Sequence, residues 1–90
     1  MIFTIEEARN ILRIDGSDND AMIYALLSAI PSYLEATTGY AAVNGYSPLA
    51  QAAARFLLQL WYYGENSDTD KLQRVIDSLL KALSAERAQS

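Results

Sequence analysis

The apolar residues of the first twenty positions recur every three or four residues, which predicts a short helix rather than a strand. Thr4 and Glu7 form a capping box, in which each side chain bonds the backbone amide of the other residue and starts the helix. The turn-forming run at 15–18 indicates that this helix ends near Arg13. Its apolar stripe consists of Ile5, Ala8, Ile11 and Leu12.

A longer second helix is expected to begin at Asp18 or Asn19, because both side chains can accept hydrogen bonds from free helix amides. It is expected to end at about Thr38, since Gly39 readily adopts the left-handed conformation that closes helices. Pro31 lies inside it and predicts a kink or a local break, because proline lacks an amide proton and crowds the preceding turn. The predicted stripe is Ile23, Leu26, Leu27, Ile30, Tyr33, Leu34 and Thr37.

The third helix is predicted from Ser47-Pro48, a cap residue followed by proline at the first helical position, to about Gly64. Alanines at positions 50, 52, 53 and 54 make its beginning slim and allow another helix to approach closely. Its predicted apolar stripe is Leu49, Ala53, Phe56, Leu57, Leu60 and Trp61.

The fourth helix follows a polar connector, in which Ser67 or Asp68 can act as the cap. Its polar tail beyond Ser84 is expected to fray. The predicted stripe, the most regular in the chain, is Leu72, Val75, Ile76, Leu79, Leu80 and Leu83. The opposite side of this predicted helix is polar and consists of Lys71, Arg74, Asp77, Ser78 and Lys81.

These elements predict one all-α domain over residues 1–90, a compact bundle of four helices, or of five if the second helix breaks at Pro31. The chain is too short for a second core. No apolar run reaches the roughly 18–20 residues that a membrane span needs, so no membrane partner is expected. The first ten residues include two acids and lack the basic, then apolar, pattern of a signal peptide, which predicts folding in a cytoplasm.

The chain contains no cysteine and no histidine, which excludes disulfides and thiol chemistry and removes the commonest general base. The acidic turn at Asp15, Asp18 and Asp20 differs from a calcium-binding EF-hand loop starting at Asp15. Such a loop needs glycine at its sixth position and glutamate at its twelfth, which here are Asp20 and Leu26. No phosphate-binding or nucleophile motif is present. We therefore expect no enzymatic activity, catalytic residue, metal or cofactor.

The chain carries seven basic and eleven acidic residues, a net charge of −4. Domains that neutralise nucleic-acid phosphates usually show the opposite balance. No predicted helix is rich in lysine or arginine, as a recognition helix would be. A small helical DNA-binding regulator is therefore the alternative function, not the preferred one.

Aromatic residues gather at two places in the chain: Tyr33, Tyr40 and Tyr46 lie near the long loop, and Trp61 to Tyr63 end the third helix. Three consecutive helical residues cannot all face one core. Tyr62 or Tyr63 is therefore expected to face solvent or another chain, and tyrosine is favoured at protein interfaces. The sequence leaves two roles open for these tyrosines. They either pack in the core or cap the helix, or they contact another subunit.

Several short segments follow one another in a recognisable order along residues 3–63. They are Glu7-Ala8, Leu12-Arg13-Ile14-Asp15, Asp18 to Asp20, Tyr33-Leu34-Glu35, Thr38-Gly39, Ser47-Pro48 and Leu60-Trp61-Tyr62. In this order and spacing the chain resembles the small head–tail connector (adaptor) proteins of long-tailed bacteriophages and prophages, a family also labelled as DNA-packaging proteins. It departs from the family at Pro31, in a helix that is usually unbroken. It also departs after Tyr63, where members tend to carry an arginine.

The resemblance implies an all-α structural protein of the virion that forms a ring of about a dozen copies between portal and tail. Such a ring completes the head after DNA packaging and passes DNA through its centre without specific binding. The implied partners are copies of the chain itself, the portal protein and a downstream connector or tail-completion protein. The region after Lys81 is implied in portal contact. The candidate interface residues are Tyr40, Tyr46, Tyr62, Tyr63, Lys81 and Arg87.

Overall fold

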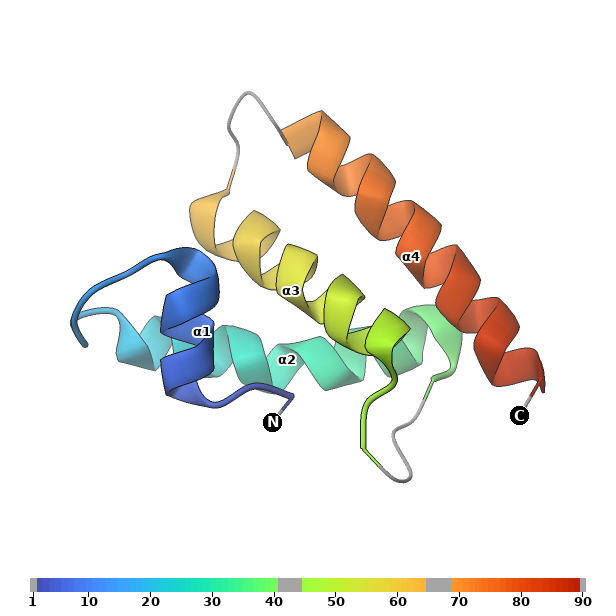
Figure 1. Ribbon diagram of the computed structural model, residues 1–90, viewed down its shortest axis with the longest axis horizontal. Helices are drawn as coiled ribbons and strands as arrows, with labels where there is room; N and C mark the ends of the chain where they lie inside the picture. The colour runs from blue at the N-terminus through green and yellow to red at the C-terminus, as the bar shows by residue number, and fades with distance from the viewer. Residues whose placement is uncertain (1, 41–44, 65–68, 90) are drawn as a thin grey trace.

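The computed structural model describes residues 2–40, 45–64 and 69–89, the side chains at 69 and 87–89 excepted. These ranges contain four helices and no strand: α1 (Ile5–Leu12), α2 (Asp20–Thr38), α3 (Pro48–Tyr63) and α4 (Thr69–Gln89) (Figure 1). The predicted all-α fold is confirmed.

The molecule is a flat slab with extents of 41 × 31 × 18 Å. Its short dimension corresponds to about two helix diameters, so the helices form two layers. α2 lies behind the other helices, with α3 in front of it (Figure 1). α2 and α3 each contact all three other helices, whereas α1 and α4 flank α3 without touching each other along the described residues.

The ends of α1 and α3 follow the predicted local signals. The Thr4 hydroxyl accepts a hydrogen bond from the Glu7 amide at 3.1 Å, and a Glu7 carboxylate oxygen accepts one from the Thr4 amide at 2.9 Å. Arg13 ends α1 in the left-handed conformation, with φ of 58°. At the start of α3, the Ser47 hydroxyl accepts from the Ala50 amide at 3.2 Å. Both predicted caps are confirmed.

The sequence predicted a kink or a local break at Pro31; α2 passes through Pro31 as one helix, so the break does not occur and the described residues form four helices, not five. Ile30 and Leu34 are fully buried on either side of the proline, so core packing supports the helix on both sides of it. The predicted placement of Thr37 in the core is also wrong, because Thr37 is exposed and Thr38 is buried. The buried Thr38 hydroxyl is satisfied: it donates to the Leu34 carbonyl at 2.7 Å and accepts from the Tyr40 amide at 3.1 Å.

The core is formed by side chains from all four helices. Its largest fully buried members are Leu12, Ile23, Leu27, Ile30, Leu34, Leu57, Leu58, Ile76 and Leu83. On α3, three of the four predicted small residues, Ala50, Ala53 and Ala54, are also fully buried, whereas Ala52 is only partly covered. The predicted α3 stripe is shifted, because Leu58 is buried whereas Trp61 and the other large predicted members, apart from Leu57, are only partly covered. Three helices contact α3, so the side of α3 that carries small residues faces the core. Its bulky residues lie at the edges of that buried side.

α4 buries Ile76 and Leu83 and exposes the predicted polar side. Val75 does not belong to the buried stripe: it is 43% exposed, because it lies about 100° around the helix from Ile76. The helix continues to Gln89, past Ser84, so the polar tail belongs to α4; its fraying stays a prediction. The predicted caps Ser67 and Asp68 lie outside the described residues.

The close packing of α3 gives a direct stability prediction. Ala54→Leu inserts three carbon atoms where the structure leaves no exposed surface, so we expect a loss of about 1–3 kcal/mol in the free energy of unfolding. The control is Ala82→Leu on the exposed side of α4, with an expected change within about 0.5 kcal/mol. Urea unfolding followed by circular dichroism measures both, and equal stability of the two variants would contradict the packing argument.

Candidate interaction surfaces

The aromatic residues at the end of α3 divide between the interior and the surface. Trp61 is partly buried and meets Tyr33 edge to face, with ring centroids 5.2 Å apart. Tyr62 is half-buried and meets Tyr63 edge to face at 5.1 Å, while Tyr63 is 52% exposed. The expectation that one of the two tyrosines faces away from the core is confirmed, and that residue is Tyr63.

Polar side chains near the end of α3 attach the end of α1 and the beginning of α2. The Tyr63 hydroxyl donates to the Leu12 carbonyl. Gln59 donates from Nε2 to the Ile11 carbonyl at 3.4 Å. The last carbonyls of a helix have no partner within that helix, so α3 supplies the donors that α1 lacks.

The start of α2 is held in a way that its sequence did not predict. Asn19 occupies the N-cap position but makes no side-chain cap bond. Its Nδ2 donates instead to the Tyr62 hydroxyl at 2.7 Å. Tyr62 and Tyr63 therefore have intramolecular roles, and what remains available to another chain is mainly the exposed ring of Tyr63.

An ion pair between Arg9 of α1 and Asp20 of α2 joins the first two helices. The Arg9 Nε donates to Asp20 Oδ1 at 2.9 Å, and a terminal guanidinium nitrogen donates to Oδ2. This bidentate hydrogen bonding lowers the pKa of Asp20 and raises the pKa of Arg9. Sequence reasoning treated Asp20 as part of an acidic turn and missed the pair, because no local spacing rule links residues across a turn.

Tyr40 and Tyr46, at the opposite end of α3, are partly buried against the core. The Tyr40 hydroxyl accepts from the Ser47 amide at 2.9 Å, and its proton points to the Gly45 carbonyl at 3.5 Å. The Tyr46 carbonyl accepts from Gln51 Nε2 at 3.0 Å. These bonds support the segment that leads into α3.

The candidate interface residues whose side chains the structure describes, namely Tyr40, Tyr46, Tyr62, Tyr63 and Lys81, do not form one patch. The two tyrosine pairs lie at opposite ends of α3, about 24 Å apart along a 16-residue helix. Lys81 is exposed on α4, whereas the side chain of Arg87 lies outside the described residues. An interface that used both tyrosine pairs would have to extend along the whole length of α3.

A surface that sequence reasoning missed is the outward side of α2. Met22 and Tyr24 are 50% and 48% exposed there. We call it the α2 outer face; its exposed residues are Ala21, Met22, Tyr24, Ala25, Ser28, Ala29 and Ser32. No charged residue occurs between Asp20 and Glu35. A helix that is apolar or small on every side is normally covered on every side, and this long uncharged run was the available signal.

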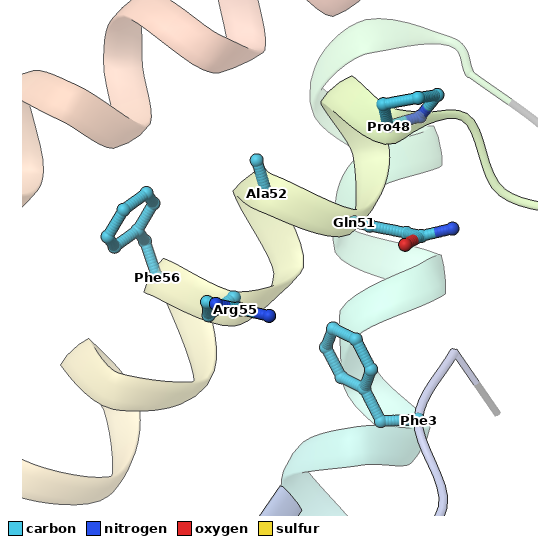
Figure 2. A pocket seen from close by; sticks show the side chains of 6 residues that line it. All are labelled: Phe3, Pro48, Gln51, Ala52, Arg55 and Phe56. Atoms are coloured by element: carbon cyan, nitrogen blue, oxygen red, sulfur yellow. The ribbon is translucent and has the colours of Figure 1, made fainter. Parts of the chain in front are cut away.

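The other side of the molecule carries a hollow of about 320 Å³ over α3. We call it the α3 hollow; it is lined by Phe3, Pro48, Gln51, Ala52, Arg55 and Phe56 (Figure 2). Phe3 comes from the segment before α1 and lies across from Gln51 and Arg55, while Ala52 and Phe56 project toward α4. α2 lies behind α3 in both figures, so the hollow and the α2 outer face are on opposite sides of the slab.

The described residues offer no cluster of three or more acidic side chains that could hold a metal ion. None of the helices, along the residues that the structure describes, is both long and apolar enough to cross a bilayer. Comparison of the chain with protein-family models, with curated proteins and with solved structures gave no match.

The hydrogen bond from Tyr63 to Leu12 can be tested by removing one hydroxyl. Tyr63→Phe keeps the ring and leaves the Leu12 carbonyl without this donor, so we expect the free energy of unfolding to fall by about 0.5–1.5 kcal/mol. Tyr24→Phe is the matched control, because its ring is similarly exposed and its hydroxyl has no partner among the described residues. Denaturant unfolding of the two variants that gave equal values would show that the bond does not contribute.

The Arg9–Asp20 pair predicts a pH-dependent contribution to stability. The folded pKa of Asp20 is lowered, so its contribution is complete above the unfolded value of about 3.9 and is lost as the pH falls through the folded pKa. A double-mutant cycle of Arg9→Gln and Asp20→Asn, measured by urea unfolding, should therefore give a favourable coupling at pH 7 that shrinks by pH 3. A high salt concentration at pH 7 should reduce the coupling energy as well, because the ion pair is partly exposed to solvent. A coupling that was the same under all three conditions would refute an ionic pair.

Proposed function

We propose that this chain is a structural virion protein that forms a ring of its own copies between portal and tail. The ring completes the head after DNA packaging and passes DNA through its centre. The proposal rests on the resemblance of residues 3–63 to the small head–tail connectors and on the surface of the folded chain.

The observation that carries the proposal is the uncharged α2 outer face. Half-exposed Met22 and Tyr24 cost free energy in water, which a covering protein surface would recover. A function based on packing against other chains makes use of such a face, whereas a DNA-binding or catalytic function does not require it.

The charge distribution supports the proposed passage of DNA. The net charge of −4 gives a channel that does not hold phosphates tightly. Over the described side chains of α4, the exposed Lys71, Arg74 and Lys81 are interspersed with Asp70 and Asp77, so these residues form no continuous basic strip. We assign portal contact to the C-terminal part of α4, which carries Lys81, Glu86 and Arg87, because the resemblance implies this region in portal contact.

The decisive experiment combines assembly with DNA binding. Sedimentation velocity and negative-stain microscopy of the concentrated chain, alone and with a purified phage portal protein, should reveal rings or a portal-bound complex. Mobility-shift assays at physiological salt should show no retarded DNA, because few phosphates can be neutralised. A chain that stays monomeric with the portal and shifts a DNA fragment would instead be a small helical regulator.

A further inference from the structure

We propose that neighbouring copies join head to tail, with the α2 outer face of one copy seated in the α3 hollow of the next. This inference rests on the proposed function in one respect, namely that the partner is a second copy of the chain. It adds the two surfaces that form the contact.

The first argument is the position of the two surfaces. They differ from each other and lie on opposite sides of an 18 Å slab. A pair of copies joined through them leaves one free surface at each end, so the contact is heterologous and a ring satisfies every copy. Each copy in the ring then makes two contacts, one through its α2 outer face and one through its α3 hollow.

The second argument is charge. Molecules with a net charge of −4 repel each other, so a contact between copies must keep acids apart. The α2 outer face contains no charged residue, and Arg55 is the charged residue that lines the α3 hollow. Contact between these surfaces therefore places no acid against another acid.

The charges at the edges are also complementary. Arg55 is exposed and has no ionic or hydrogen-bond partner among the described residues. Glu35 is exposed one turn beyond Ser32, at the end of the α2 outer face, and is likewise unpaired within the described ranges. Asp20, at the other end of that face, is already bonded to Arg9. Glu35 of one copy is therefore the carboxylate that the geometry assigns to Arg55 of the next.

The third argument is size. The span from Ala21 to Ser32 is about 18 Å long and roughly one helix wide. A contact of this size is smaller than the roughly 800 Å² that one partner contributes to a standard interface. A single pair should therefore be weak, whereas ring closure, with two contacts for each copy, makes assembly cooperative.

Cysteine cross-linking tests the contact without background, because the chain has no cysteine of its own. Ala25→Cys labels the α2 outer face and Ala52→Cys labels the α3 hollow. After oxidation, the mixture of the two variants should form a disulfide-linked pair, and neither variant alone should do so. Ala82→Cys on α4, mixed with Ala25→Cys, is the control and should stay unlinked.

The other possible cross-linking results separate failure of the proposed contact from failure of the proposed function. Efficient linking of Ala25→Cys to itself would show that two α2 outer faces meet about a two-fold axis and would overturn the proposal. Unlinked mixtures under conditions where wild-type rings are visible would also overturn it, while leaving the proposed function intact. A wild-type chain that forms no ring and binds no portal would refute the proposed function itself.

Charge reversal supplies an independent readout in solution. Glu35→Arg and Arg55→Glu should each weaken self-association by roughly three- to tenfold, measured by sedimentation, because each places like charges together. Mixing the two variants in equal amounts should restore association, because alternating copies re-create an Arg–Glu pair at every contact. Arg74→Glu makes the same charge change on α4 and should leave association unchanged. Weakening without rescue in the mixture would refute the pairing.

Discussion

The close packing of α3 against its neighbours is the interaction on which the rest of this structure depends. Ala50, Ala53 and Ala54 are fully buried, so α3 can lie close to other helices, and larger side chains there would push them apart. Because α3 lies in front of α2 and between α1 and α4, it contacts all three helices. The opposite side of the same helix remains open and forms most of the α3 hollow.

α3 also decides where the short helix α1 lies. α1 has eight residues and buries only Ala8 and Leu12, so its apolar contacts alone are few. Hydrogen bonds from Gln59 and Tyr63 to its last carbonyls, and the Arg9–Asp20 pair, supply additional links to α3 and α2. The aromatic run at the end of α3, which looked like a surface for other chains, is therefore largely used inside the molecule.

The surfaces left for partners are those that the bundle does not cover. α2 is apolar on its inner side and uncharged on its outer side, yet the other three helices all lie on the inner side. An isolated monomer has no structural need for an uncharged outer side over so many residues. The position of the α3 hollow on the other side makes a repeated contact between copies geometrically simple.

The features that the sequence predicted correctly depend on residues within a few positions of each other. The capping box of Thr4 and Glu7, the Ser47-Pro48 start and the Gly39 end are local, so their hydrogen bonds follow from spacing alone. The heptad-like pattern likewise predicted which residues of α4 are polar and exposed.

The features decided only by the tertiary structure link residues far apart in the chain. Tyr63 meets Leu12 and Asn19 meets Tyr62 across more than forty residues, and no local rule predicts such pairs. The continuity of α2 through Pro31 depends on packing around Ile30 and Leu34, which outweighs the local tendency to break. The sequence alone therefore determined the all-α fold, both ends of α1 and α3 and the Gly39 end of α2. The tertiary structure decided which sides are covered, because burial depends on the neighbours that a folded chain brings together.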